Sequence, residues 1–309
     1  MKLYHRKPQD NAPLGQADPY MIKANGYYYV YATHEKGVQL YKSKSLKEGW
    51  EFMGFCYSRE NEVSYWAPSV IELDGKFYMY YSTRYVGNED VHSHQIKVAV
   101  STSPEGPFEF KCELLEPFSI DAHVIKDETG LYIFYCNNDY DSDRAGTFIM
   151  LDKMVDPFTV EGKPVRVVVP TLDEEIFEKN RFKQGQHWHT IEGAFYFKEG
   201  DYHYVMYSGS TYQKDTYFIG YSVAKGETDD LRKLNYQKYP NDNTYCPLVC
   251  KNEFLEGSGH NSVIKEGDKY YIVYHARDIA EPVKDQDTRS FRVDELKVDN
   301  GILKVDLTL

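Results

Sequence analysis

The sequence predicts an all-β protein, a five-bladed β-propeller that forms one domain over residues 1–309. Three observations predict it. One phrase, made of a short apolar strand, a glycine turn and a tyrosine-rich strand, occurs five times, and its copies begin near residues 17, 66, 120, 191 and 258. Each copy is followed by further strand-like segments, which gives about four strands per unit. No linker rich in proline or serine separates the copies, so one domain is favoured over two.

The strands of each unit are indicated by β-branched and aromatic residues in alternation, bounded by Gly, Asn, Asp or Pro. The first unit runs through ADPYMIKANGYYYVYA, GVQLYKS and WEFMGFCYS. The second adds HQIKVAVSTS and FEFKCELL, the third GTFIMLDKM and GKPVRVVVP, and the fourth YFIGYSVA, before the fifth copy, SGHNSVIKEGDKYYIVYH. The longest interval between copies contains residues 170–190, PTLDEEIFEKNRFKQGQHWHT, where we expect one short helix in a loop that lines a pocket.

Composition narrows the class of partner and the compartment. The net charge of −12 disfavours nucleic acid and anionic membranes, which attract basic patches. No run of 18 apolar residues is present for a membrane span. The N-terminal MKLYHRKPQDNAPLG has no apolar stretch typical of a secretory signal, and the five cysteines form no CxxC pair. We therefore expect a cytoplasmic protein with reduced thiols and with no nucleic-acid or membrane partner.

Three carboxylates occupy matching places in the repeat. When the copies are aligned on their turn glycines, the opening position holds Asp18, Ala67, Asp121, Glu192 and Gly259. This position begins the strand nearest the axis, so we expect the three acids to converge at one mouth of the central channel. A lone Asp-Pro, as at residue 18, is usually a turn or a cap. Three acids at equivalent positions favour a site instead.

Such a trio suits hydrolysis of a glycosidic bond, which needs one carboxylic acid and one carboxylate in unlike environments. A neighbouring carboxylate would keep Glu192 protonated near neutral pH, and Asp121 is the candidate for this tuning. Asp18, across the channel, would activate water as the base. A separation of roughly 6.5–9.5 Å between the acid and base carboxyl groups would predict inversion, and about 5–5.5 Å would predict retention.

The chain resembles a known family through several phrases together. ADPYMIKANGYYYVYAT, YWAPSV, SIDAHVI, TIEGAFYFKEGDYHYVMYSGS and GHNSVIKEGDKYYIVYHARD are similar to glycoside hydrolase family 43, five-bladed propellers that act on polysaccharides containing arabinose and xylose. The likeness covers all five units. It implies that Asp18 is the general base and Glu192 the general acid of an inverting enzyme. Asp121 would modulate the pKa of Glu192 and have an orienting role.

The resemblance also implies two substrate-binding residues. Trp66, in YWAPSV, would line the sugar pocket, with packing within a blade as the alternative reading. An arginine in TRSFRV would reach the sugar, and the register favours Arg289 over Arg292. Alternation along a strand allows only one of the two to face inward, and an exposed ion pair is expected for the other.

Three histidines near the acids are further candidates for substrate binding. His187 and His189, in GQHWHT, precede Glu192 and are expected to line the pocket, with plain loop structure as the alternative. They do not predict a zinc site, because no third ligand follows at a suitable spacing. His123 lies two residues after Asp121, so strand alternation predicts that it shares the face of that acid.

His260, in GSGHNS, is the only candidate for contact with a metal. The resemblance implies a place for it beside a central cation, often calcium, that is held largely by water. One histidine is a poor calcium cage, because calcium prefers 6–8 oxygen ligands. We therefore expect no required cofactor, and any calcium near the axis would be a structural support.

The sequence favours exo action that removes α-L-arabinofuranosyl units from small arabino- or arabinoxylo-oligosaccharides. TIEGAFYF, YHARD and TRSFRV resemble the single-domain arabinofuranosidases of the family, and no β-sandwich is expected after ILKVDLTL. A β-D-xylosidase or a bifunctional enzyme is the main alternative, and an endo-arabinanase is a weaker one. A carbohydrate-binding propeller without catalysis is the non-enzyme alternative, but it would predict the loss of an acid.

Overall fold

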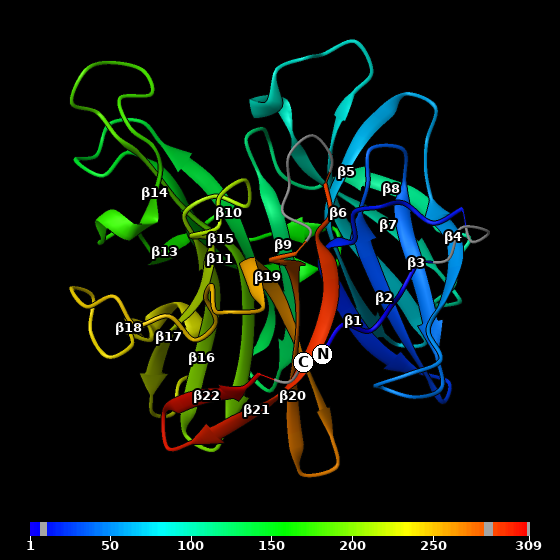
Figure 1. Ribbon diagram of the computed structural model, residues 1–309. Helices are drawn as coiled ribbons and strands as arrows, with labels where there is room; N and C mark the ends of the chain where they lie inside the picture. Colours follow the sequence, from blue (N-terminus) through cyan, green and yellow to red (C-terminus); the bar gives the residue numbers. More distant parts are fainter. Residues whose placement is uncertain (7–10, 281–286, 308–309) are drawn as a thin grey trace.

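The computed structural model describes residues 1–6, 11–280 and 287–307 (Figure 1). Over these ranges there is no α-helix, and the three 3-10 turns are η1 (Val91–Ser93), η2 (Asp173–Glu175) and η3 (Leu231–Lys233). The all-β prediction is therefore confirmed. No helix in the described part of the chain is long and apolar enough to cross a membrane.

The helix expected in residues 170–190 is wrong. The segment forms only η2 and the three-residue strand β14 (Ile176–Glu178). The side chain of Glu175 accepts hydrogen bonds from the backbone N–H groups of Thr171 and Leu172. These bonds stabilise a single 3-10 turn. Ile176 then pairs with β15 (Trp188–Glu199), so the backbone hydrogen bonds go to a sheet instead of a longer helix.

Three of the sheets in the described residues are four-stranded antiparallel meanders in which chain neighbours pair. The first contains β1 (Ala17–Ala24), β2 (Tyr27–Thr33), β3 (Val38–Ser43) and β4 (Glu51–Tyr57). The second contains β5 (Glu62–Leu73), β6 (Lys76–Tyr85), β7 (Gln95–Ser101) and β8 (Glu109–Glu113). The last contains β19 (Leu255–Glu266), β20 (Lys269–Asp278), β21 (Ser290–Asp299) and β22 (Ile302–Asp306).

The third and fourth repeat units are joined into one ten-stranded sheet of the described chain. The joint is a short parallel pairing between β11 and β15, in which Gly146 lies opposite His189 and Thr147 opposite Thr190. The third unit supplies β9 (Ile120–Asp127), β10 (Gly130–Asp139), β11 (Gly146–Asp156), β12 (Thr159–Val160) and β13 (Val165–Val168). The fourth supplies β14, β15, β16 (Tyr202–Gly209), β17 (Phe218–Lys225) and β18 (Gln237–Lys238).

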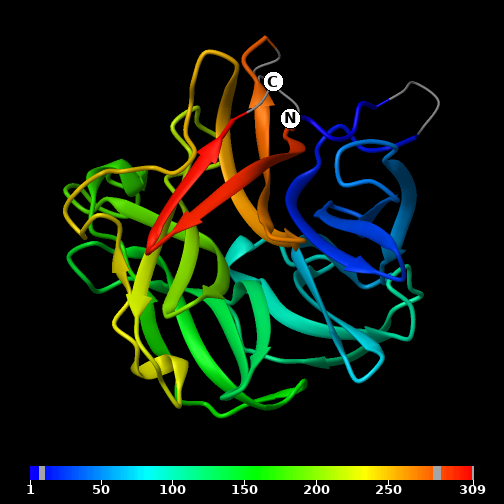
Figure 2. The ribbon, with the colours of Figure 1, turned by 90° about the horizontal axis from the view of Figure 1, so that it is seen from below.

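The first strands of the five units contact one another in cyclic order. β1 contacts β5, β5 contacts β9, β9 contacts β15, β15 contacts β19, and β19 contacts β1. Figure 2 shows the sheets around a common centre, with the blue first unit beside the orange and red last unit. The N-terminal segment also contacts the last unit, because Leu3 N–H donates a hydrogen bond to the carbonyl of Phe291 in β21. The opening residue of every unit is thereby brought close to the centre.

Tyrosine is mainly a core residue in this fold. One buried cluster between the first two sheets contains Tyr29, Tyr31, Tyr65 and Tyr81 with aliphatic neighbours. Their rings pack between the sheets, and the hydroxyls find partners, as where Tyr57 and Tyr81 share a 2.8 Å hydrogen bond. The high tyrosine content is therefore explained mainly by packing between sheets and is not by itself evidence of sugar binding.

Candidate active site

Each of the five first strands carries a bulge where it approaches the centre. The bulge begins with a residue of left-handed backbone, and the five φ angles are 54° at Asp18, 44° at Ala67, 59° at Asp121, 66° at Gly193 and 44° at His260. The pairing register with the second strand shifts at each of these places. Bulges bend a strand and re-aim its side chains, and they are common beside active sites. Here they turn the bulged residues toward the centre.

The bulges correct the repeat alignment made from the sequence. Asp18, Asp121 and His260 are equivalent to one another, whereas Glu192 lies one position earlier, opposite Ser208. The turn glycine gave a register one residue off in the fourth and fifth units, because it is the first residue of the two-residue turn there (Gly200, Gly267) and the second in the first two units (Gly26, Gly75). The general-acid candidate therefore corresponds in position to Trp66, which also directly precedes a bulge.

Six of the predicted site residues line one small pocket of about 120 Å³. These residues are Asp18, Trp66, Asp121, Glu192, His260 and Arg289. The pocket is completed by Thr33, Ile120, Tyr212 and Tyr217. Its small volume makes it a compact pocket at the centre of the molecule. We call it the acid pocket.

Asp18 is surrounded by donors and positive charge. Thr33 Oγ1 donates a 2.5 Å hydrogen bond to its Oδ2. The Nδ1 atoms of His260 and His275 each lie 3.4 Å from Oδ1, and Arg289 Nη1 lies 3.6 Å from it. Burial alone would raise the pKa of Asp18, but these histidines and the arginine outweigh burial and hold that pKa below its usual range. Asp18 is therefore a carboxylate at neutral pH.

Glu192 has the opposite character. Burial and, to a lesser extent, the charge of Asp18 raise the pKa of Glu192, which is about 7 in the folded protein. The Tyr217 hydroxyl, which donates a 2.6 Å hydrogen bond to Oε1, and the Arg289 charge oppose that rise in pKa. A carboxyl group with a pKa near the working pH is suited to give and take a proton.

Asp121 is the most enclosed of the three acids. It accepts hydrogen bonds from Gly193 N–H, at 3.0 Å, and from the thiol of Cys136, at 3.9 Å. Burial and the charges of Glu192 and Asp18 hold the pKa of Asp121 well above its usual range. Because Asp121 and Glu192 repel each other when both are ionised, at least one of the two carboxyl groups stays protonated near neutral pH.

The two predicted substrate-binding residues stand at the pocket wall. Trp66 stacks on His94 with ring centroids 3.6 Å apart and an interplanar angle of 12°. Arg289 is held by Asp287, which accepts from Nε at 3.0 Å and from Nη2 at 2.7 Å. Arg292 does not line the acid pocket and pairs with Asp278, and because Arg292 is buried this is not the exposed ion pair that was expected.

Five residues at the site were not predicted: Thr33, Ile120, Tyr212 and Tyr217, which line the acid pocket, and His275, which lies beside Asp18 without lining the pocket. Thr33 ends a tyrosine-rich strand and His275 lies in the YHARD motif, so both could have been found from their places in the repeat. Tyr217 precedes a strand of the fourth unit, and Tyr212 lies in the loop before it. No periodicity marks a loop residue, so the sequence gives no signal for Tyr212.

The other three histidines lie outside the acid pocket. His123 faces away from Asp121, because the bulge between them breaks the alternation on which the shared face was predicted. Its Nδ1 lies 3.0 Å from the Tyr20 hydroxyl, and its Nε2 lies 3.2 Å from the carbonyl of Tyr196.

His187 and His189 also lie away from the acids. His189 is buried with its Nδ1 near the carbonyl of Ala145 and its Nε2 near Arg144. His187 Nδ1 accepts a hydrogen bond from the Asn180 N–H. A structural role in the loop, the alternative to substrate binding, is therefore favoured for both histidines, since their rings contact loop backbone and an arginine.

The protein side chains around His260 do not form a calcium cage by themselves. Its Nδ1 faces the carboxylates, 3.4 Å from Asp18 Oδ1 and 3.9 Å from Asp121 Oδ2. Within the part of the chain that the structure describes, no three Asp, Glu, His or Cys side chains are grouped to hold a metal ion. Calcium needs many more oxygen ligands than this arrangement offers. His260 contributes to the charge balance of the acids instead.

A small pocket on an all-β scaffold, holding one ionised and one protonated carboxyl group, is the site of a glycoside hydrolase. The family model "Glycosyl hydrolases family 43" matches residues 12–303, and the chain belongs to this family.

Among its relatives, an extracellular exo-α-(1→5)-L-arabinofuranosidase of Streptomyces chartreusis is 26% identical over 90% of this chain and 85% of that protein. A β-xylosidase of Xylanibacter ruminicola is 26% identical over 77% of this chain and 72% of that protein. The crystal structure of a thermostable family-43 glycoside hydrolase is similar with a TM-score of 0.80 and 30% identity, over 95% of this chain and 93% of that one.

The expected cytoplasmic location is wrong. It was inferred from the N-terminal residues and from the cysteines, whereas the Streptomyces chartreusis relative is named as an extracellular enzyme. The cysteines do not decide the compartment, because all five are free thiols in surroundings that range from buried Cys136 to exposed Cys246, which is compatible with either location.

Proposed function

We propose that the protein is an inverting, exo-acting α-L-arabinofuranosidase that removes terminal arabinofuranosyl units from arabino- or arabinoxylo-oligosaccharides. The observation that carries the proposal is the contrast between Asp18 and Glu192, two carboxyl groups in one small pocket with pKa values shifted in opposite directions. This is the acid–base pair that glycoside hydrolysis requires.

In the reaction, Asp18 accepts a proton from a water molecule as the water oxygen bonds to the anomeric carbon. Thr33 fixes the orientation of Asp18 by its hydrogen bond, and His260, His275 and Arg289 favour the ionised form of Asp18. As the bond from the anomeric carbon to the leaving oxygen breaks, Glu192 gives its proton to that oxygen. The protein and water supply every proton, and Asp18 and Glu192 return to their starting states by exchange with solvent.

Asp121 acts on this pair without touching the scissile bond. Its Oδ2 is fixed by Gly193 N–H, the residue directly after the general acid. Asp121 therefore orients the segment that carries Glu192, and it competes with Glu192 for a proton.

Exo action on arabinofuranosides is supported by the pocket and by the relatives. A pocket of about 120 Å³ suits a single terminal sugar better than a chain that passes through. The Streptomyces chartreusis relative is named for removal of α-(1→5)-linked L-arabinofuranose and aligns over most of both chains. The Xylanibacter ruminicola relative supports β-xylosidase action as the second candidate.

We further propose that the chain is a single five-bladed β-propeller domain spanning residues 1–309. The cyclic contacts among the five first strands and the contact between the N-terminal segment and β21 support it. Residues 7–10, 281–286 and 308–309 belong to this proposed span but lie outside the described residues. We propose a neutral oligosaccharide as the partner and no cofactor in the reaction.

A panel of aryl glycosides tests the proposed function. Release of the aryl group from the α-L-arabinofuranoside and little release from the β-D-xyloside is the expected result. The reverse preference would make the enzyme a β-xylosidase. Release from neither, with oligosaccharides still bound, would favour a carbohydrate-binding protein and overturn the proposal.

A further inference from the structure

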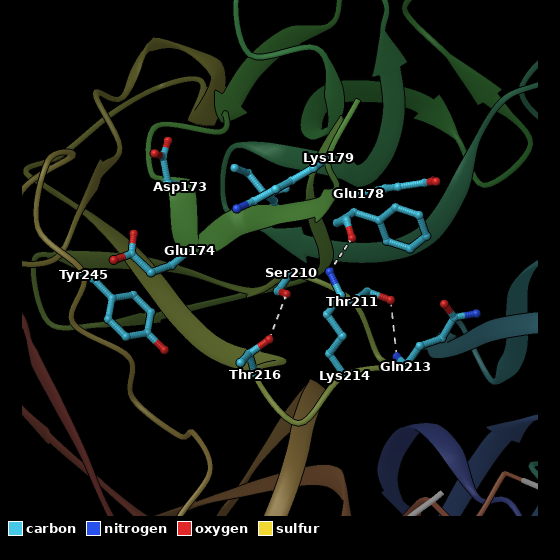
Figure 3. Close-up of a pocket in the computed structure, with 12 residues that line it drawn as sticks. Asp173, Glu174, Glu178, Lys179, Ser210, Thr211, Gln213, Lys214, Thr216 and Tyr245 are labelled. Atoms are coloured by element: carbon cyan, nitrogen blue, oxygen red, sulfur yellow. Dashed lines mark hydrogen bonds between the residues drawn. The ribbon is translucent and has the colours of Figure 1, made fainter. Parts of the chain in front are cut away.

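A second and larger cavity, of about 810 Å³, adjoins the acid pocket. Figure 3 shows residues that line it. One side is formed by the segment that contains η2 and β14, with Asp173, Glu174 and Phe177. Gln213 and Lys214 form the opposite side, and the ring of Tyr245 closes an end. We call it the outer cavity. The reaction proposed above does not use any of its residues.

The two cavities share residues 210–217 as a common wall. Tyr212 and Tyr217 line the acid pocket, whereas Gln213, Lys214 and Thr216 line the outer cavity. The ring of Tyr212 is 41% exposed and lies 4.2 Å from the Arg289 guanidinium, at the rim between the two. A sugar chain that leaves the acid pocket over Tyr212 therefore enters the outer cavity.

The lining suits a neutral sugar chain. Carboxylate, amide and hydroxyl groups offer hydrogen bonds to sugar hydroxyls, and the half-exposed rings of Tyr245 and Phe177 offer apolar faces. The charges are mixed with a small negative excess, because Asp173, Glu174 and Glu178 are only partly offset by Lys179 and Lys214. A cavity without one dominant sign of charge gives no electrostatic preference for a polyanion.

Both sides of the outer cavity are held in place from behind. Buried Arg277 donates to the carbonyl oxygens of Tyr212, at 2.5 Å, and of Lys214, at 2.9 Å. Lys214 Nζ donates to the carbonyl of Phe177 at 2.6 Å, which ties the two sides together.

On the far side of the outer cavity, Glu175 turns into the interior and pairs with buried Lys238 at 2.5 Å. This pair fixes the turn that presents Asp173 and Glu174 to the cavity. Walls that are fixed before a ligand arrives lose less conformational entropy on binding.

We propose that the outer cavity binds the leaving-group end of the oligosaccharide whose terminal sugar occupies the acid pocket. This inference rests on the proposed function and deepens it. The sizes agree with such a division, because the acid pocket suits one sugar unit and the outer cavity is several times larger. Gln213 and Tyr245 are then residues that determine preference for chain length.

The test compares substrates with and without an extended leaving group. Gln213→Ala and Tyr245→Ala are measured with an aryl α-L-arabinofuranoside and with α-(1→5)-linked arabinotetraose. Tyr27→Ala, in a separate cavity of about 590 Å³, is the matched control. We expect kcat/KM for the tetraose to fall about fivefold in both variants, as for residues that carry binding energy. We expect the aryl substrate to be unaffected and Tyr27→Ala to match the parent with both substrates.

An equal fall with both substrates, or no fall with either, would overturn the proposal. Gln213 is exposed, so its variant separates loss of binding from loss of folding. If the parent protein cleaves neither substrate, the proposed function has failed, and calorimetry with Glu192→Gln decides the binding question. Weaker binding of arabinotetraose or xylotetraose after Gln213→Ala would then support the outer cavity, and unchanged or undetectable binding would overturn it.

Discussion

The hydroxyl of Tyr217 donates a 2.6 Å hydrogen bond to Oε1 of Glu192. This bond stabilises the ionised form of the glutamate and so opposes burial, which raises the pKa of Glu192. It also fixes one carboxyl oxygen, which leaves Oε2 as the atom that carries the transferable proton. A loop residue that no sequence pattern indicates thereby sets both the protonation and the orientation of the proposed general acid.

Replacement of Tyr217 by Phe should raise the pKa of Glu192 above about 7, because the hydrogen bond to the charged form is lost. The alkaline limb of the pH profile of kcat/KM should therefore move to higher pH, and kcat should fall as the carboxyl group loses its orientation. An alkaline limb that stays in place or moves down would contradict this assignment.

Replacement of Asp18 by Asn should lower kcat by about 100- to 10,000-fold, the range for loss of a general base. It should also lower the pKa of Glu192, since the charge of Asp18 raises that pKa. The residual activity should therefore decline at lower pH than in the parent. Asp278→Asn is the matched control, because Asp278 pairs with Arg292 away from the pocket.

Protein stability should depend on Glu192 between about pH 4 and pH 7. Its pKa in the folded protein is about 7, above the ~4.3 of an unfolded chain, so the folded state binds this proton more tightly. The stabilisation is present below the unfolded pKa and is lost as the pH rises through 7. Urea titrations at pH 5 and pH 8 should show a smaller loss for Glu192→Gln than for the parent, and equal losses would refute the raised pKa.

Gly193→Ala should reduce both stability and activity. An added Cβ would lie 3.0 Å from His260 Cγ, and the φ of +66° is unfavourable for alanine. The backbone penalty of about 1–2 kcal/mol should lower Tm by a few degrees. Gly200→Ala has a similar φ of +56° and no atom within 4 Å of its Cβ, so it provides the matched control.

If the contact with His260 matters, Gly193→Ala should lose more activity than Gly200→Ala at a similar loss of Tm. Equal activities in the two variants would mean that the fit between Gly193 and His260 does not support catalysis.

The repeats made the all-β fold and the three acids predictable, because a strand that opens each unit near a centre leaves few places for a buried carboxylate. The position of the bulge within each strand was not predictable. The turn glycine is the second turn residue in the first two units and the first turn residue in the fourth, so alignment on glycine places Glu192, instead of Gly193, at the position of Asp18 and Asp121.

The same bulges explain the orientations of His123 and His260. His123 was assigned to the face of Asp121 from alternation, which holds only in a regular strand. His260 was assigned to an ion from the resemblance, while the structure aims its Nδ1 at two carboxylates. Tyr212 and the outer cavity depend on loop geometry, which is set by long-range contacts such as that of Arg277 and carries no periodic signal.

The anomeric configuration of the sugar first released tests the central claim most directly. Proton NMR of the parent enzyme with an aryl α-L-arabinofuranoside, recorded before mutarotation, should show the β-anomer as the first product, because Asp18 delivers water to the face opposite the leaving oxygen that Glu192 protonates. Initial appearance of the α-anomer would mean that Asp18 attacks the sugar itself, and it would contradict the account.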